Sequence, residues 1–160
     1  MNAFEAWLES TRLSVFMAHS FVAWVTCAIL HFLGLSLLIG TVGLFDLRLL
    51  GVAKGLSPSA MHRLIPWGVL GFAVNLITGT LFFIGMPFRY IHNPAFQLKL
   101  TFLAVLGINM LVFYANAYRK VARLGPDEAT PVGAKIAGGT SFILWIGVIC
   151  AGRMVAFFLQ

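Results

Sequence analysis

Residues 22–45 read VAWVTCAILHFLGLSLLIGTVGLF, an apolar run that contains no Asp, Glu, Lys or Arg. Three further runs of similar length follow at about 64–88, 98–118 and 136–159. A helix of about 20 apolar residues crosses the hydrocarbon core of a bilayer, which is about 30 Å thick. Because a helix satisfies its own backbone hydrogen bonds, each run is expected to span as a helix. The sequence therefore predicts an all-α membrane protein with four transmembrane helices.

The composition agrees with this class and leaves little chain for anything else. Of the 160 residues, 60% are hydrophobic and only 10% are charged, whereas a soluble domain carries about 25% charged residues. Four spans and their connections make up a single transmembrane domain over 1–160, so a large catalytic unit would have to be a partner subunit. The sequence contains no catalytic triad, P-loop, dinucleotide fingerprint or zinc motif, so enzymatic activity of the chain on its own is not expected.

The segment 1–18 precedes the first span and mixes apolar with charged residues. Glu5, Glu9 and Arg12 are unlike the basic start of a cleaved signal peptide. Apolar side chains lie between them, at Phe4, Trp7, Leu8 and Leu13. This pattern predicts a short amphipathic helix that lies in the membrane interface.

Basic residues are distributed unevenly between the two ends of the expected spans. The connections after the first and third spans, with the adjoining helix ends, hold most of the 11 Lys and Arg residues: Arg48, Lys54, Arg63, Arg119, Lys120, Arg123 and Lys135. Such an excess marks the cytoplasmic side of a membrane protein. We therefore expect an antiparallel bundle in the bacterial inner membrane, with both termini and the connection 86–97 in the periplasm. The basic residues are interpreted as orientation signals, so no nucleic-acid partner is expected.

His31 is the most informative polar residue within a span. An unpaired polar side chain in hydrocarbon is costly, so the imidazole needs a partner. Three interpretations stay open. The ring can ligate the iron of a haem b, with Gly34 and Gly40 leaving room for the macrocycle, or it can bind quinone or another metal. It can instead hydrogen-bond a polar side chain of another helix, for which the candidates are Asn75, Thr78, Asn109 and Thr140.

Two basic residues lie inside the outer halves of spans, against the usual distribution. Lys99 is about one turn into the third span, and Arg153 is about two turns before the end of the fourth. Either each side chain extends to the outer headgroups, or both hold an anionic group such as a haem propionate, a quinone oxygen or a partner's carboxylate. We predict that His31, Lys99 and Arg153 converge on one pocket in the outer half of the bilayer.

A polar layer is expected near the middle of the bundle. Trp145 and Asn109 are estimated to lie at the depth of His31 and Asn75. The indole N–H of a buried tryptophan needs an acceptor. This layer either locks the helices together or borders a cofactor.

Asp46 and Arg48 end the first span on the side that carries most basic residues. Residues two apart do not face each other on a helix, so each is expected to pair with another helix or connection. A structural pin between helices is one interpretation of Asp46, and a role in proton entry is the other.

The outer half also gathers side chains that suit copper(I): Met17, His19, Cys27, His31, Met86, His92, Cys150 and Met154. Methionine and cysteine are also ordinary apolar residues of spans. If His31 binds the iron of a haem, His92, or His19 from a bent segment, is the candidate second ligand, provided that the iron lies near the outer face. Cys27 and Cys150 are at similar estimated depths, so a disulfide between the first and fourth helices is a further alternative.

Several short motifs occur together along the chain. They are His31 with Gly34, the segment DLRLLG at Asp46–Gly51, Thr78-Gly79, Asn93-Pro94 followed by Lys99, Asn109, and Trp145 followed by Gly152-Arg153. In this combination the chain resembles a poorly characterised family of bacterial four-helix integral membrane proteins. It is also broadly similar to small b-type cytochromes and to the membrane domain of copper-resistance proteins. The resemblance implies a four-helix membrane domain with sparse histidines.

Three functional hypotheses follow from the sequence. The leading one is a membrane anchor or electron-transfer subunit of a larger respiratory assembly, with haem b or quinone near His31, Lys99 and Arg153. The second is a protein that handles copper. The third is a structural accessory subunit without a cofactor, whose polar residues only hold helices together.

Overall fold

The computed structural model describes residues 3–53 and 55–158, and its elements are all helical over that part of the chain. Four helices are long: α3 (Phe21–Leu50), α5 (Ile65–Gly85), α7 (Pro94–Asn116) and α9 (Val132–Phe158). The short helices are α1 (Ala3–Glu9), α2 (Arg12–His19), α4 (Pro58–His62), α6 (Pro87–Ile91) and α8 (Tyr118–Val121). Lys54, one of the basic residues counted above, lies outside the described residues, as do the ends of the expected segments 1–18 and 136–159.

The four long helices correspond to the four expected spans. Each is long and apolar enough to cross a membrane, and α4 joins α5 in the second of these segments, Pro58–Gly85. Large apolar side chains on their outer faces are exposed, among them Phe32, Ile77, Leu111 and Ile143. A surface of this kind is suited to lipid, because water would not solvate it. The prediction of an all-helical protein with four candidate spans is therefore confirmed.

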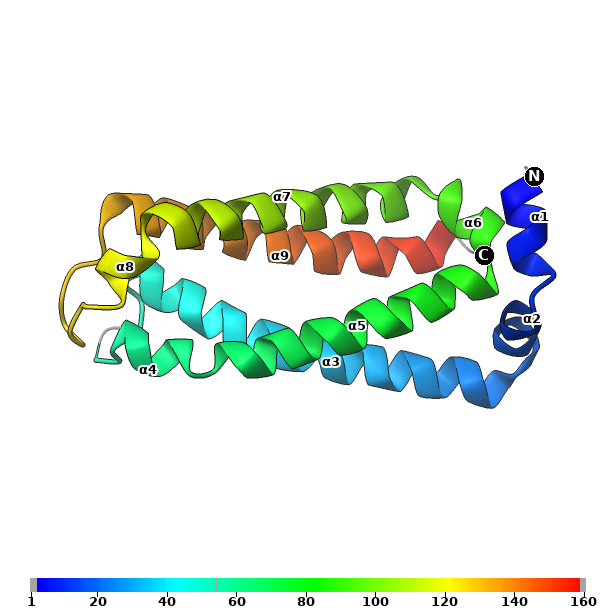
Figure 1. The fold of residues 1–160 in the computed structure, drawn as a ribbon, viewed down its shortest axis with the longest axis horizontal. Helices are drawn as coiled ribbons and strands as arrows, with labels where there is room; N and C mark the ends of the chain where they lie inside the picture. The colour runs from blue at the N-terminus through cyan, green and yellow to red at the C-terminus, as the bar shows by residue number, and fades with distance from the viewer. Residues whose placement is uncertain (1–2, 54, 159–160) are drawn as a thin grey trace.

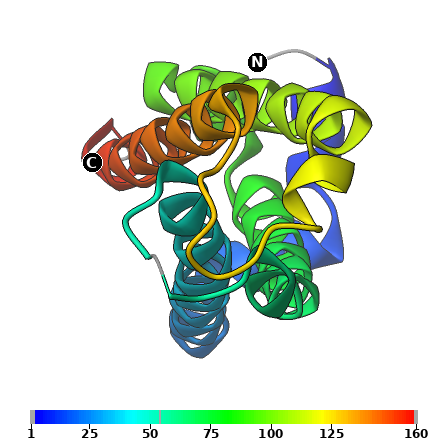
Figure 2. The same ribbon diagram turned by 90° about the vertical axis from the view of Figure 1, so that its left-hand side faces the viewer.

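The long helices are arranged as two pairs. In Figure 1, α3 and α5 form the lower pair and α7 and α9 the upper pair, and α3 also packs against α9. The short helices α1, α2 and α6 lie at one end of the bundle, where α9 also ends, and α4 and α8 lie at the other. Figure 2, viewed toward the α4/α8 end, shows the connection between α8 and α9 crossing that end of the bundle.

Small residues allow α3 and α5 to approach each other closely. A Cβ added to Gly71 would lie 2.6 Å from the carbonyl oxygen of Gly34 and 2.8 Å from the backbone nitrogen of Leu38. A Cβ on Gly68 would lie 2.6 Å from Oγ1 of Thr41. Close backbone approach at small residues is the common way for helices to associate in a bilayer. These glycines bring the polar residues of α3 within reach of α5.

Glycines of α9 have the same role against two other helices. A Cβ on Gly138 would lie 2.8 Å from Cβ of Leu49 in α3, and one on Gly147 would lie 2.8 Å from the Phe102 ring in α7. Near the α4/α8 end, Phe45, Leu49 and other buried apolar residues form a core with Phe113. The fourth span, α9, therefore packs both against its pair partner α7 and against α3 of the other pair.

The helix ends differ from the expected boundaries where capping residues decide them. The N-terminal segment is two helices rather than one, because the Thr11 side chain accepts a hydrogen bond from the backbone N–H of Ser14 and starts α2. The third span begins at Pro94 rather than at 98, with Asn93 as its N-cap. Pro87 starts the separate helix α6, so the second span ends before 88.

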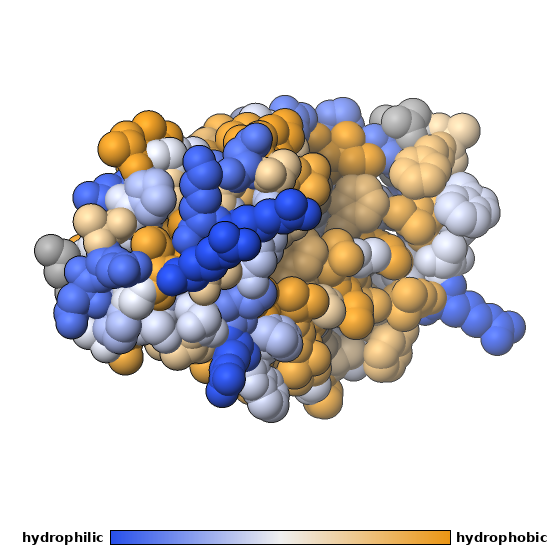
Figure 3. Space-filling model, turned by 60° about the vertical axis from the view of Figure 1, so that its left-hand side comes forward, coloured by the Kyte–Doolittle hydropathy of each residue, from blue (hydrophilic) through white to orange (hydrophobic). Residues whose placement is uncertain are grey.

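Hydrophilic side chains gather at the α4/α8 end. Figure 3 shows them in blue at that end, whereas the middle of the bundle in the same view is mostly apolar. The described basic residues of this end, apart from the buried Arg48, have exposed side chains: Arg63, Arg119, Lys120, Arg123 and Lys135.

Candidate functional site

His31 is bound to the neighbouring helix α5. Its Nδ1 lies 2.7 Å from Oγ1 of Thr78. The ring also contacts Phe82 edge-on at 5.8 Å between ring centroids, and a Cβ on Gly79 would lie 3.7 Å from its Cε1. Of the three interpretations of His31, the structure shows the hydrogen bond to a polar side chain of another helix, with Thr78 as the partner.

The hydrogen bonds of Thr78 determine which nitrogen of His31 carries the proton. The Thr78 hydroxyl donates to the carbonyl oxygen of Val74 at 2.7 Å. Since a hydroxyl has only one hydrogen to donate, Oγ1 acts as the acceptor toward His31, and Nδ1 is the N–H donor. In the neutral ring the lone pair is then on Nε2. Within the described part of the chain Nε2 has no hydrogen-bond partner, so it is the nitrogen that can accept a bond or ligate a metal.

Cys27 is bound to the same threonine. Cys27 lies one turn before His31 on α3, and its Sγ is 3.4 Å from the carbonyl oxygen of Thr78. The thiol is buried and Cys150 is exposed, and both are free. The alternative of a Cys27–Cys150 disulfide is therefore not realised.

Lys99 of α7 extends toward this region from the other pair of helices. Its side chain is half-buried and runs along Gly152 of α9, where an added Cβ would lie 3.7 Å from Nζ. The ammonium group of Lys99 lies within electrostatic range of the imidazole of His31. No carboxylate pairs with this ammonium group among the described residues. His31 and Lys99 therefore form the candidate site, with an unshared nitrogen and an unpaired cation near each other.

The structure does not bring Arg153 into the candidate site. Its side chain is exposed, and the guanidinium lies over the ring of Phe157, one turn further along α9, at 5.8 Å from the centroid. The expected convergence of His31, Lys99 and Arg153 is thus limited to His31 and Lys99. The physical reason is that neighbouring residues of a helix point about 100° apart, so Arg153 turns away where Gly152 faces Lys99.

The expected polar layer of His31, Asn75, Asn109 and Trp145 is not formed. Asn109 donates from Nδ2 to the carbonyl oxygen of Ala137 on α9 at 3.0 Å. Lys99 precedes Asn109 by ten residues, so Asn109 lies about 15 Å further along α7, away from the candidate site. Asn75 bonds Gly71 of its own helix. The half-buried Trp145 makes no hydrogen bond to any residue that the structure describes.

Asp46 and Arg48 do bond other segments, as expected. Asp46 is buried, and its carboxyl is hydrogen-bonded by the hydroxyl of Ser141 on α9. Arg48 has only 1% of its surface exposed. It acts as a pin between the two connections at this end rather than as a surface charge.

The guanidinium of Arg48 is surrounded by oxygen acceptors. Its Nε donates to the carbonyl oxygen of Leu56 at 2.5 Å, and Nη2 donates to those of Gly125 and Pro126 at 3.1 and 2.8 Å. Nη1 donates to Oγ1 of Thr130 at 3.2 Å. A planar group with five N–H donors is suited to bind two loops at once.

Sequence reasoning missed a cluster around His62. Nε2 of His62 lies 3.0 Å from the Tyr114 hydroxyl, and Nδ1 lies 3.4 Å from that of Tyr118. The ring also packs against Phe45. The sequence signal was available, because Tyr114 and Tyr118 are four residues apart and so share a helical face.

The side chains considered for copper are not gathered into one site. Nε2 of His92 lies 3.3 Å from Oε1 of Glu5 in α1. His19 bonds the carbonyl oxygen of Val15. Met17 is buried, whereas Met154 is exposed. Over residues 3–53 and 55–158, no three His, Cys, Asp or Glu side chains are grouped so as to hold a metal ion.

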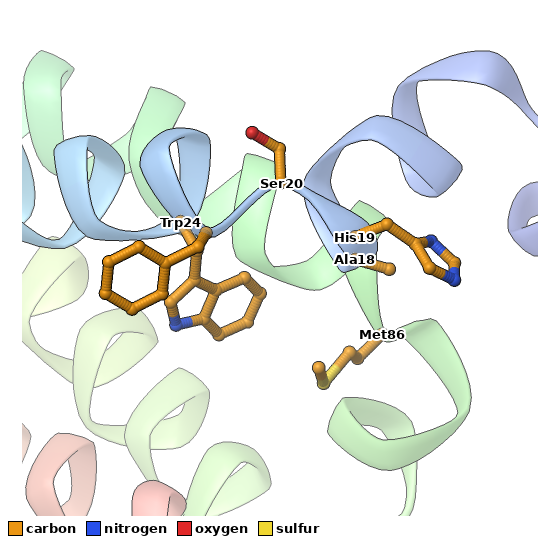
Figure 4. A pocket seen from close by; sticks show the side chains of 6 residues that line it. Ala18, His19, Ser20, Trp24 and Met86 are labelled. Atoms are coloured by element: carbon orange, nitrogen blue, oxygen red, sulfur yellow. The ribbon is translucent and has the colours of Figure 1, made fainter.

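An open hollow of about 310 Å³ lies where α2 meets α3, and its lining includes Trp24 and Met86. Figure 4 shows Trp24 and Met86 beside this hollow, whereas the imidazole of His19 points away from both. The hollow is therefore mainly apolar, and His19 does not aim a ligand nitrogen into it.

Comparison with known proteins adds no relative to this description. No family model, no curated protein and no solved structure matches the chain.

Proposed function

We propose that this chain is an integral membrane subunit of a respiratory electron-transfer assembly, and that it binds a quinone between His31 and Lys99. The observation that carries the proposal is the hydrogen bond from Nδ1 of His31 to Thr78. It leaves Nε2 as an unshared acceptor in an apolar span, with the unpaired Lys99 close enough for its charge to act on the ring. Polar groups of this kind inside a bilayer mark functional sites.

The two side chains have complementary chemistry toward a quinone. The hydroxyl of a quinol can donate a hydrogen bond to Nε2 of His31, which then acts as the proton acceptor. The ammonium group of Lys99 can donate to the quinone oxygen and stabilise the negative charge that develops there. Quinones are soluble in the hydrocarbon core, so such a ligand can reach this depth from the bilayer.

A haem b at the same position is the second candidate. In metal sites, a histidine that ligates through one nitrogen almost always donates its other N–H to an oxygen acceptor, as His31 does toward Thr78. His31 would hold the iron of such a haem, and Lys99 would bind a propionate. The described residues bring no second histidine to His31, so they do not provide the paired ligands of a six-coordinate haem.

The proposal includes an orientation of the bundle in the bacterial inner membrane. The contacts of α3 with α5 run in opposite order along the two helices, from His31 with Thr78 to Thr41 with Gly68, which supports an antiparallel arrangement. The exposed basic side chains of the α4/α8 end support a cytoplasmic position for that end. The termini and the candidate site would then lie on the periplasmic side.

Tryptophan fluorescence of the purified protein tests the proposal. The Trp24 ring packs against Phe82, which contacts His31, so a quinone at the site should quench Trp24. We expect saturable quenching by a short-chain ubiquinone analogue, and loss of most of that quenching in a Trp24→Phe variant. An absorption spectrum after haem-replete expression checks the second candidate, because bound haem gives a Soret band.

Three variants locate the ligand. His31→Asn keeps an N–H donor for Thr78 and removes Nε2, and Lys99→Met keeps the apolar stem and removes the charge. Each should weaken the quinone titration at least about tenfold, the loss expected from one charge-assisted hydrogen bond. Arg153→Met is the matched control and should bind as the wild type does. Equal binding by all three variants would rule out a site between His31 and Lys99. The absence of saturable quenching in the wild type, without a Soret band, would replace this proposal by a structural accessory subunit.

A further inference from the structure

Asp46 is enclosed between two spans at the opposite half of the bundle from the candidate site. Its side chain is 4% exposed, and Oδ2 has no hydrogen-bond partner among the described residues. The carboxyl is bonded by the Ser141 hydroxyl of α9. The two helices are close here, because a Cβ on Gly138 would lie 3.2 Å from the carbonyl oxygen of Asp46. One carboxyl oxygen is thus buried without a donor to bond it.

The cations nearest to Asp46 in the chain do not neutralise it. Arg48 is two residues away on α3, but its guanidinium binds the carbonyl oxygens of Leu56, Gly125 and Pro126 together with the hydroxyl of Thr130. On α9, the exposed Lys135 precedes Ser141 by six residues, so it lies about 9 Å further along the helix.

The polar side chains of the other helices packed near Asp46 do not supply it with a positive charge. On α4, His62 packs against Phe45, next to Asp46, but both of its ring nitrogens face tyrosine hydroxyls. Arg63, at the end of α4, is exposed. On α7, Asn109 is an amide bonded to Ala137. No ion pair to Asp46 is formed in the part of the chain that the structure describes.

We propose that Asp46 is a proton-binding site within the membrane, and that it carries its proton on Oδ2. A buried carboxylate with neither a counter-charge nor enough donors is so unfavourable that the group neutralises instead. The balance is simple: a proton from water at the α4/α8 end forms an O–H bond with Oδ2, and no other bond changes. Ser141 then donates to the remaining carbonyl oxygen of the acid.

A proton fits this site better than a metal cation. Hard cations need six or more oxygen ligands, whereas one carboxyl and one hydroxyl are gathered here. The site is also separate from the proposed quinone site, because His31 and Asp46 are 15 residues apart on α3, which is about 22 Å. Its test therefore does not depend on whether quinone binds.

Labelling with dicyclohexylcarbodiimide tests the proposal on the full chain in lipid vesicles. This apolar reagent adds the protonated carboxylic acid across its C=N bond and needs no other reactant. We expect peptide mass spectrometry to find the adduct on Asp46, with labelling that falls about tenfold per pH unit once the acid ionises. Asp46→Asn should remove the adduct, whereas Asp127→Asn, at an exposed acid of the α8–α9 connection, should leave it unchanged.

Two further measurements make the result decisive. The infrared spectrum at neutral pH should contain the carbonyl stretch of a protonated carboxylic acid, which Asp46→Asn removes and Asp127→Asn retains. The melting temperature of Asp46→Asn should equal or exceed that of the wild type, because an amide resembles the neutral acid. An ionised Asp46 in the infrared spectrum, or protection of Asp46 from labelling by sodium ions at constant pH, would overturn the proposal.

Discussion

Thr78 serves three partners on two helices. Its hydroxyl donates to Val74 and accepts from His31, and its carbonyl oxygen accepts from the Cys27 thiol. The orientation of the imidazole therefore depends on a residue that itself touches no ligand in the proposed site. In the sequence, a threonine that bonds only its own helix looks the same as one that bonds a neighbouring helix. The sequence alone therefore does not identify this role of Thr78.

Replacing Thr78 by valine keeps the shape of the side chain and removes the acceptor for His31. We expect Thr78→Val to lower the free energy of unfolding by about 1 kcal/mol, because Nδ1 of His31 loses its partner inside the bundle. Thr80→Val is the matched control, since the exposed Thr80 bonds only Leu76 of its own helix. Thermal unfolding in detergent measures both, and equal melting temperatures of the two variants would contradict this account of Thr78.

For single residues, the sequence predicted which side chains bond another segment better than it predicted their depth and direction in the bundle. It indicated that Asp46 and Arg48 bond other segments, and it gave such a bond as one of three interpretations of His31; both follow from the cost of unpaired polar groups in hydrocarbon. It placed Asn109 at the wrong depth and Arg153 in the wrong direction. Counting residues from the end of a span ignores the tilt and the rotation of each helix, and these are set by packing against neighbouring helices.

At the scale of elements, the glycines of α3 and α5 have different surroundings, and only some of them allow the two helices to pack closely. A Cβ on Gly71 would meet backbone atoms of Gly34 and Leu38 at 2.6 and 2.8 Å, whereas a Cβ on Gly40 would meet nothing within 4 Å. Both residues are helical, so the sequence shows two similar glycines. Only the packing separates a contact glycine from one that faces outward.

This difference predicts opposite effects of the same substitution. Gly71→Ala should destabilise the protein by about 1–3 kcal/mol, because the backbones of α3 and α5 must separate. Gly40→Ala should be neutral or stabilising by up to about 1 kcal/mol, because alanine favours the helix and meets no neighbour. The melting temperatures in detergent check the sign of each effect, and a loss of stability in Gly40→Ala that matches Gly71→Ala would contradict it.

Element boundaries were harder to predict from the sequence than the elements themselves, even where a cap and a proline occur together. Asn93 and Pro94 are the N-cap and the first residue of α7, but the apolar run that marks the third span begins only at about 98. The break between α1 and α2 was missed, because a single threonine caps α2 and the apolar pattern continues across it. Hydropathy reports the environment of a side chain, and it carries little information about where the backbone turns.

At the scale of the whole molecule, the two ends of the bundle differ in charge and in their short helices. The proposed orientation places the α4/α8 end in the cytoplasm and α1 and α2 in the periplasm. We test it in a Cys150→Ala background, in which the buried Cys27 remains, with one added cysteine at an exposed position: Ala129→Cys in the α8–α9 connection or Ser10→Cys between α1 and α2. An impermeant thiol reagent added to spheroplasts should label position 10 and not position 129. The reverse pattern would invert the orientation.

Fold class was the most predictable property of the chain, because four long apolar runs admit few alternatives in a bilayer. The pairing of the helices was not predictable in the same way. Every span of a membrane protein is apolar on the face toward lipid and on the face toward other helices, so the period of the hydrophobic pattern does not show which face is inside. The pairs α3–α5 and α7–α9 are determined by glycine positions that only packing identifies.

The Arg48 pin has a consequence for the order of biosynthesis. Its guanidinium belongs to the first span, but most of its acceptors, at Gly125, Pro126 and Thr130, are synthesised about eighty residues later. While the ribosome is still making the third helix, this charge has only the early connection at Leu56 and the surrounding water to solvate it. Arg48 can therefore complete its hydrogen bonds only after the α8–α9 connection has been synthesised. In a nascent chain that ends before this connection, the guanidinium would lack its acceptors at Gly125, Pro126 and Thr130.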